Sequence, residues 1–422
     1  MAGPAPTPPT SSTTPGSPTS STTTNPVLFN PFDPAVRADP YPSYRTLREV
    51  EPVHRSSIGL VVLTRYDDVS RALRETVFSR DLETNATPGP FVGRRRQLRN
   101  APRGRSMLVL DPPDHTRLRR LVQAAFTPRA IDRLRPRIQQ LVDAVLDRAA
   151  DSGGTELVGD LAFPVPFQVI SDLLAMPTER AEELRSWSQA LTQGLEPACT
   201  EEQLAAADVA ARSMGGYVQE VIADRRRHLG DDVLSGLIVV EEGGDALTTD
   251  ELVATVLLLY VAGHETTVNL IGNGVLALLR HPDQLARWRA DPALDAHAVD
   301  ELLRFDGPVQ LTVRVPLEPV RFDDVEVEAG TPVMAVLGAA NHDPAEFERP
   351  DDLDLGRPNA ARHLAFGGGI HYCLGAALAR AEAQIAIGTL IRRFPHVDLA
   401  AEPEWRDRLT IRGVSRLELA VA

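Results

Sequence analysis

The chain has 422 residues and a formal net charge of −14, from 44 basic and 58 acidic side chains. An acidic surface of this kind argues against phosphate-backbone binding, so nucleic acid is not an expected partner. The two cysteines, Cys199 and Cys373, lie far apart and form neither a disulfide framework nor a CxxC zinc motif, which favours a reduced, cytoplasmic protein.

The first 26 residues are rich in Pro, Ser and Thr and carry neither charge nor an apolar block. They lack the basic start and the hydrophobic centre of a signal peptide, so we expect residues 1–26 to be a disordered tail.

From Pro31 onward the pattern is mainly helical, with brief strand-like pieces. The expected helices are Thr116–Arg148, Glu202–Arg227, Thr249–Arg280, Ala296–Arg304 and Gly375–Arg393, and the expected strands lie within Gly59–Thr64, Val320–Val327 and Pro332–Val336. Thr249 is the expected N-cap of its helix, since two acidic residues follow it. The sequence therefore predicts a mainly α fold with a minor β portion.

A basic segment between Glu83 and Asp111 contains no acidic residue. Its arginines are Arg94, Arg95, Arg96, Arg99, Arg103 and Arg105. Runs of like charge are usually solvated surface, but several guanidinium groups together also suit a carboxylate or a phosphate. Both interpretations stay open.

The apolar run Leu252–Gly263 is well short of the roughly 20 residues that cross a bilayer, so a buried helix fits it better than a membrane span. The motif AGHETT, Ala262–Thr267, follows in the same helix. Its glycine and threonines permit a local bulge in which a hydroxyl bonds to a freed carbonyl. The alternative is a core threonine, which suits Thr267 alone better than the whole motif.

Two further pairs share a helical face. Glu301 and Arg304 are one turn apart; such a pair is usually an ordinary surface ion pair, although apolar neighbours indicate partial burial. His115 and Arg119 have the spacing i, i+4.

Cys373 lies between a glycine run and the start of a helix. The free N–H groups and the positive end of a helix dipole lower a thiol pKa, and glycines let the backbone approach a flat group. Phe366 is placed to shield the sulfur and His371 to donate to an anion. A buried structural cysteine is the alternative, but it explains neither the glycines nor the histidine.

The stretch FGGGIHYCLG resembles the haem-binding loop F-x-x-G-x-H-x-C-x-G of cytochrome P-450 monooxygenases, with Phe366, Gly369, His371, Cys373 and Gly375 at the fixed positions. The resemblance extends from Pro31 to the C-terminus and is closest to the soluble bacterial members. It implies a single domain over residues 27–422, a triangular helical prism whose long central helix lies over haem b, with the Cys373 thiolate as the axial iron ligand.

The resemblance also implies the roles of further residues. Ala262 and Gly263 would lie over the haem, and Glu265 and Thr266 would be the catalytic acid and alcohol that relay protons. Phe366 and Gly375 would contact the haem, and its propionates would be bound by His115, Arg119, Arg314 and His371. Glu301 and Arg304 would lock the core; their usual third partner, an arginine within RPDDLDLGR, is expected at the position of Asp352, which would leave the triad incomplete.

The implied activity is insertion of one atom of O2 into a medium-sized, largely apolar organic compound, such as a secondary metabolite, a steroid-like or a fatty compound. The sequence shows no flavin or iron–sulfur motif, so electrons would come from a ferredoxin and its NAD(P)H-dependent reductase, docked near Arg117, Arg119 and Arg120. The basic segment would favour an anionic substrate or an acidic carrier protein that presents one, and no membrane partner is expected. A peroxide-driven enzyme of the same fold and a non-enzymatic haem sensor or carrier are the alternatives.

Overall fold

The computed structural model describes residues 1, 3, 29–30, 33–89, 105–197, 199–239, 241–242 and 245–422. Residues 1–26 lie almost wholly outside these ranges, and of the six arginines in the basic segment only Arg105 lies within them. The predictions of a disordered tail and of an anion-binding loop therefore fall on residues that are not described.

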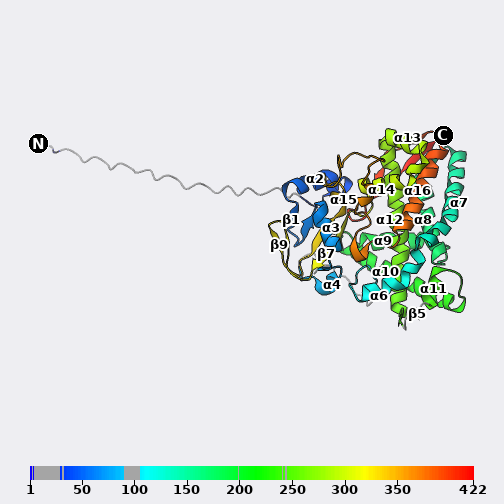
Figure 1. Cartoon of the computed structure of the whole chain (residues 1–422), viewed down its shortest axis with the longest axis horizontal. Coiled ribbons are helices and arrows are strands. Elements are labelled where there is room, and N and C mark those ends of the chain that lie inside the picture. Colours follow the sequence, from blue (N-terminus) through cyan, green and yellow to red (C-terminus); the bar gives the residue numbers. More distant parts are fainter. Residues whose placement is uncertain are drawn as a thin grey trace.

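Helices make up the larger part of the molecule (Figure 1). They are α1 (Pro34–Ala38), α2 (Tyr41–Val50), α3 (Tyr66–Arg74), α4 (Leu82–Asn85), α6 (Asp114–Gln123), α7 (Pro128–Ser152), α8 (Pro164–Leu173), α9 (Ala181–Gln193), α10 (Glu201–Arg227), α11 (Val233–Val239), α12 (Thr249–Arg280), α13 (Pro282–Ala290), α14 (Asp295–Asp306), α15 (Leu337–Ala340) and α16 (Ala376–Arg393).

The strands gather mainly beside α2 and α3, at the opposite end of the molecule from α7 and α16 (Figure 1). A five-stranded sheet has the order β1 (Val53–Arg55), β2 (Val61–Leu63), β10 (Val333–Val336), β7 (Leu311–Pro316), β3 (Phe78–Ser79). A three-stranded sheet joins β11 (Val397–Leu399), β14 (Glu418–Val421) and β4 (Gly154–Glu156). Two-stranded pairs are β5 (Glu241–Glu242) with β6 (Asp245–Ala246), β8 (Val320–Phe322) with β9 (Val325–Val327), and β12 (Glu404–Trp405) with β13 (Val414–Arg416).

The predicted helices agree with the structure except at two points. The expected helix Thr116–Arg148 is two helices, α6 and α7, because Thr127 caps a new helix whose first residue is Pro128. The N-cap of α12 is Thr248 and not Thr249: its hydroxyl accepts the Glu251 N–H, and the Glu251 carboxylate accepts the Thr248 N–H.

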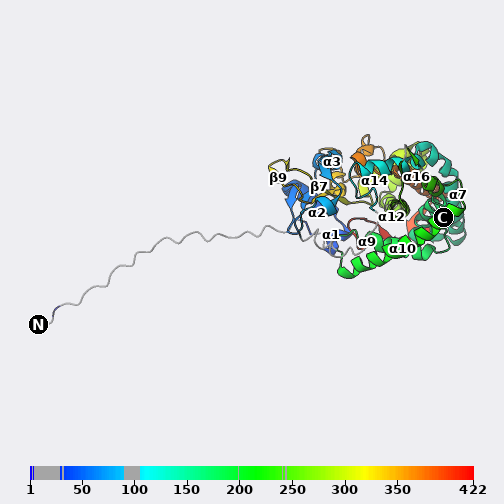
Figure 2. The same ribbon diagram turned by 90° about the horizontal axis from the view of Figure 1, so that it is seen from below.

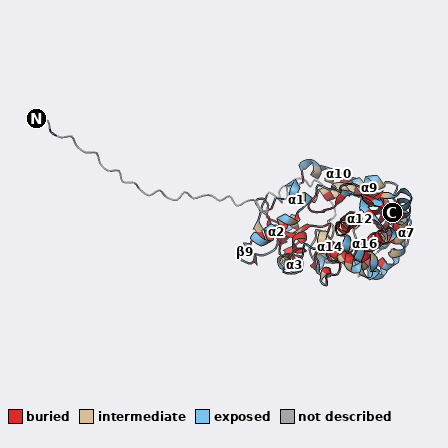
Figure 3. Cartoon of the chain, turned by 90° about the horizontal axis from the view of Figure 1, so that it is seen from above, coloured by how far each residue is buried: buried red, intermediate tan, exposed pale blue. Residues whose placement is uncertain are grey.

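Helix α12 is the centre of the core. It contacts α8, α14 and α16, while α9 and α10 lie side by side along one side of it (Figure 2), and buried residues concentrate around these helices (Figure 3). By length and composition α12 would suffice to cross a membrane. Its most apolar 18-residue stretch has a mean hydropathy of 1.2, but 61% of that stretch is buried inside the protein. Its apolar surface is therefore explained by packing, as expected for the run Leu252–Gly263.

Candidate active site

The loop before Cys373 is shaped by glycines. Gly367 and Gly369 have φ of 72° and 64°, in the left-handed region that favours glycine. A Cβ on Gly369 would also lie 2.5 Å from the Leu73 carbonyl oxygen at the end of α3. The loop thus folds tightly against α3, and the Cys373 N–H donates to the Phe366 carbonyl oxygen at 3.0 Å.

The Cys373 thiol is accessible, yet it is set deeply among protein atoms. Desolvation raises the pKa of this thiol above its ordinary value, and the Gly375 N–H and the charges of Arg119 and Arg380 offset part of that rise. An open position is thus combined with one N–H and two cations that favour the thiolate. These residues fit a thiolate that binds a metal from the accessible side.

Positive and unpartnered groups gather beside Cys373. His115 of α6 and His371 have ring centroids 4.3 Å apart, and the buried Nδ1 of His115 and Nε2 of His371 have no hydrogen-bond partner in the described structure. Arg314 of β7 is 4% exposed, and its side chain donates to the Thr312 hydroxyl and the Val313 carbonyl oxygen in the same strand.

The pKa values of this cluster reflect crowding of positive charge. Burial and then the charge of Arg80 lower the pKa of Arg314 to about 9. Burial, followed by Arg314 and His115, lowers the pKa of His371 to about 3. Burial also lowers the pKa of Arg119. Buried ring nitrogens without a hydrogen-bond partner and cations that repel one another are compatible with a group that carries carboxylates, which is the ligand that the sequence predicted for these four residues.

The AGHETT segment presents an accessible surface in the middle of α12, the central helix of the core. Ala262 is exposed, and Gly263 and Thr266 are partly exposed. The Thr266 hydroxyl donates to the Ala262 carbonyl oxygen at 3.0 Å, as predicted, but α12 stays α-helical throughout, so the predicted bulge is absent from this described helix. Gly263 is required for packing, because a Cβ there would lie 2.9 Å from Ile170 of α8.

Glu265 and Thr266 point to different surroundings. Glu265 is 2% exposed, and its Oε2 accepts from Arg406 Nη1 at 3.2 Å. His264 Nε2 lies 3.8 Å from the other carboxylate oxygen. The acid is therefore held in a buried ion pair, whereas the alcohol is accessible.

Sequence reasoning missed three polar residues near this site. Arg80 acts electrostatically on Arg314 and His371, and Arg406 pairs with Glu265. Glu382 of α16 is fully buried; desolvation raises its pKa well above the ordinary value, which the Thr267 hydroxyl opposes. Each of these three residues lies far along the sequence from the residue it acts on. Of the three, only Glu382 lies within a helix that the sequence predicted.

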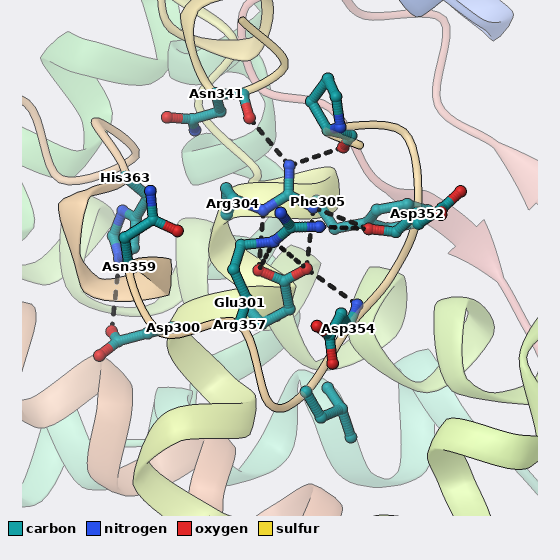
Figure 4. A network of polar contacts seen from close by, with 12 residues as sticks. Asp300, Glu301, Arg304, Phe305, Asn341, Asp352, Asp354, Arg357, Asn359 and His363 are labelled. Carbon is teal, nitrogen blue, oxygen red and sulfur yellow. Dashed lines mark hydrogen bonds and ion pairs between the residues drawn. The ribbon is translucent and has the colours of Figure 1, made fainter. Parts of the chain in front are cut away.

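The Glu301 carboxylate is the centre of a buried network (Figure 4). Arg304 donates to both of its oxygens at 2.7 and 2.8 Å, and Arg357 Nε lies 3.1 Å from each. The prediction of an incomplete triad at Asp352 was wrong: the third partner is Arg357, the last residue of RPDDLDLGR. Asp352 instead offers its backbone carbonyl to both arginines and pairs its side chain with Arg349.

The comparison with protein families decides what this arrangement is. The model of the family "Cytochrome P450" matches residues 45–291 and 292–411. The chain belongs to the cytochrome P-450 family. It is thus an oxidoreductase, a haem-dependent monooxygenase, and its haem takes the Cys373 thiolate as axial ligand.

Relatives and solved structures match over nearly the whole chain. Cytochrome P-450 107B1 of Saccharopolyspora erythraea is 45% identical, over 92% of this chain and 96% of its own length. The monooxygenase PikC of Streptomyces venezuelae is 42% identical, over 90% and 91%. The structure of P450BioI in complex with an acyl carrier protein ligated to hexadec-9Z-enoic acid has a TM-score of 0.84 at 36% identity, over 92% of this chain and 99% of that one. The chain is therefore similar to soluble bacterial members and has their fold.

Proposed function

We propose that this cytochrome P-450 hydroxylates or epoxidises a medium-sized, largely apolar compound with electrons from a separate ferredoxin and its NAD(P)H-dependent reductase. In hydroxylation, a substrate C–H bond, O2, two electrons and two protons give an alcohol and water. The observation that carries the proposal is the accessible Cys373 thiol beside the buried Arg314 guanidinium and the unpartnered ring nitrogens of His115 and His371. We assign this activity to one domain, residues 27–422, in the cytoplasm.

The haem would supply the activation of O2, and the protein residues would hold it and move protons. Its propionates would accept from His115, Arg119, Arg314 and His371; Phe366 and Gly375 would lie on the thiolate side, and Ala262 and Gly263 on the opposite side. The unpartnered ring nitrogens of His115 and His371 support this assignment, because buried polar atoms are rarely left without a hydrogen-bond partner.

Proton delivery would use Thr266 and Glu265. The Thr266 hydroxyl stands on the accessible side of α12 and would hold a proton there. Glu265 would resupply that proton, for which its carboxylate must first leave Arg406. Opening of this ion pair is therefore part of the proposed relay.

A ferredoxin is supported by the surface over the cysteine loop. Ile370 and Tyr372 are 44% and 41% exposed, and Arg74 and Arg362 line a depression of about 460 Å³ next to them. Exposed apolar side chains with cations around them suit an acidic partner. The cluster of Arg117, Arg119 and Arg120 contributes less than the sequence indicated, because Arg117 pairs with Glu251.

An acid-bearing or carrier-bound acyl substrate is the finer proposal. The relative P450BioI, solved with an acyl carrier protein, supports this class. Arg105 does not bind the acid group of such a substrate, since Arg105 pairs with Asp81 at 2.5 Å and donates to the Val109 carbonyl oxygen. The anion-binding role would fall on Arg94, Arg95 and Arg96, which lie outside the described residues.

Turnover with purified ferredoxin and reductase tests the reaction. Consumption of O2 linked to product formation supports the monooxygenase, turnover with peroxide alone supports the peroxide-driven alternative, and haem binding without either supports a sensor or carrier. In Cys373→Ala the ferrous carbon monoxide complex should lose the red-shifted band of thiolate ligation, and retention of that band contradicts the role of Cys373.

The substrate class is tested with ligand pairs that differ only by a carboxylate and its methyl ester. The spin-state shift of the haem should report tighter binding of the acid at low salt, weaker preference at high salt, and none in a variant with Arg94, Arg95 and Arg96 changed to Ala. Equal affinity for acid and ester in the parent protein contradicts the acid preference and leaves the monooxygenase activity unaffected.

A further inference from the structure

A cation stands on the protein side of the haem-binding loop. Arg380 lies on α16, seven positions after Cys373, and its guanidinium carbon is 4.6 Å from the centroid of the Phe366 ring. This distance is within the range of a cation–π contact. Phe366 in turn accepts the Cys373 N–H through its carbonyl oxygen. Phe366 therefore contacts both Arg380 and the iron ligand Cys373, and the charge of Arg380 acts on the Cys373 thiol.

The neighbouring helix holds Arg380 in place. Its Nε donates to Asp300 Oδ1 of α14 at 2.7 Å, and its Nη1 approaches the Tyr372 hydroxyl at 3.4 Å. The side chains of Arg380 and Asp300 are 24% and 15% exposed. Asp300 also contacts His363 Nε2 at 3.3 Å (Figure 4). The guanidinium group thus has contacts on two sides and cannot relocate without losing them.

Asp300 and Glu301 are consecutive residues of α14 that face different partners. Glu301 lies in the fully buried network of Arg304 and Arg357, whereas Asp300 faces α16 and the loop before Cys373. The network of Glu301 fixes the position of α14, and Asp300 uses that rigid helix to place a charge near the sulfur.

We propose that Arg380 raises the reduction potential of the haem iron and that Asp300 both positions this cation and moderates it. The physical reason is electrostatic. Reduction adds one negative charge to the iron and its thiolate, and a fixed cation close to that thiolate stabilises the reduced state more than the oxidised state. Partial burial of Arg380 limits the screening of its charge by salt.

The test is the reduction potential of the haem-loaded protein, measured by spectroelectrochemical titration at fixed pH and ionic strength. Arg380→Met removes the charge and keeps an apolar side chain over Phe366. We expect the equilibrium constant for reduction to fall about tenfold, which is 59 mV for one electron. Arg380→Lys should restore part of the loss, because it keeps the charge without the planar guanidinium group.

Asp300→Asn should shift the reduction potential in the opposite direction to Arg380→Met. The amide keeps an oxygen that accepts from Arg380 Nε but removes the negative charge, so the potential should rise. A merely structural role predicts that both substitutions disturb the loop in the same way. Shifts of the same sign in Arg380→Met and Asp300→Asn therefore overturn the proposal.

A matched control lies on the same helix. Arg392 pairs with Asp295 of α14 at 2.8 Å, twelve positions beyond Arg380, or about 18 Å further along α16. Arg392→Met should leave the potential unchanged. The red-shifted band of the carbon monoxide complex must persist in every variant, which shows that the thiolate is still bound. An Arg380→Met potential equal to that of the parent or of Arg392→Met refutes the role of Arg380.

Discussion

Replacing Glu301 by Gln tests how much the buried network contributes to stability. Glu301, Arg304 and Arg357 are 0%, 1% and 4% exposed. The substitution keeps the volume of the side chain but removes the negative charge that lies between two guanidinium groups. Two buried cations then face a neutral amide.

The expected loss follows from the cost of an uncompensated buried charge. Breaking a buried ion pair by removing one partner costs about 3–5 kcal/mol. Backbone carbonyls also accept from both arginines, among them those of Asn341 and Asp352, which favours the lower part of this range. An unfolding entropy of about 2.1 cal/mol/K per residue gives about 0.9 kcal/mol/K for 422 residues, so Tm should fall by about 3–6 °C.

Urea unfolding followed by tryptophan fluorescence measures the free energy of unfolding, and calorimetry measures Tm. The matched control is Asp324→Asn, which breaks the i, i+3 pair with Arg321 at 3.2 Å, where the side chains are 102% and 67% exposed. That control should change stability by less than about 0.5 kcal/mol. A loss below about 1 kcal/mol in Glu301→Gln would show that burial of this network is energetically neutral and would refute the reasoning.

Three further predictions concern proton delivery, a buried carboxylate and the dependence of stability on pH. Thr266→Ala should divert reducing equivalents into hydrogen peroxide while substrate affinity stays nearly constant; unchanged coupling rejects the relay. Glu196 accepts the N–H groups of Leu409 and Thr410 and so links the α9–α10 connection to the C-terminal segment. Glu196→Gln should lower the free energy of unfolding by about 1 kcal/mol, because a neutral amide oxygen accepts these N–H groups more weakly than a carboxylate, and an unaltered value in urea unfolding contradicts this contribution. Burial lowers the pKa of His264, so the folded protein keeps it neutral and loses stability as pH falls below about 6.5, by up to about 1.4 kcal/mol per pH unit. His264→Gln should make this loss shallower in urea titrations at pH 7.5 and 5.5, and an equal slope contradicts the assignment.

The parts of the structure that local chemistry determines were predictable from the sequence. The bounds of α12 follow from its apolar run and from Pro282 after its end, and the turn before Cys373 follows from its glycines. The N-cap was misplaced by one residue, because Thr248 and Thr249 are both good caps and only the reciprocal bonds with Glu251 distinguish them.

Irregular segments were harder, because they have no periodicity from which a side-chain direction follows. Within RPDDLDLGR, the sequence alone does not fix which residue returns to Glu301. The third partner of the triad was assigned to the position of Asp352, which is five residues too early, and Arg357 makes the contact. The family pattern, in which an arginine of this segment completes the triad, holds in this chain, whereas the expectation that Asp352 leaves the triad incomplete was wrong.

Arginine positions illustrate the same limit on a larger scale. The chain has no lysine, so every one of its 44 basic residues is an arginine, and residue type does not separate solvated cations from buried ones. In the C-terminal segment DRLTIRG, Asp407–Gly413, Arg408 and Arg412 are only 9% and 5% exposed. Buried guanidinium groups require hydrogen-bond acceptors around their planar N–H groups. The acceptor of Arg408 lies on α9, 216 positions away, and that of Arg412 lies on α14, 106 positions away. Arg406, the residue before this segment, pairs with Glu265, 141 positions away. Because such partners are chosen by topology, the arginines that bear on the active site can be identified only once the fold has brought their acceptors together.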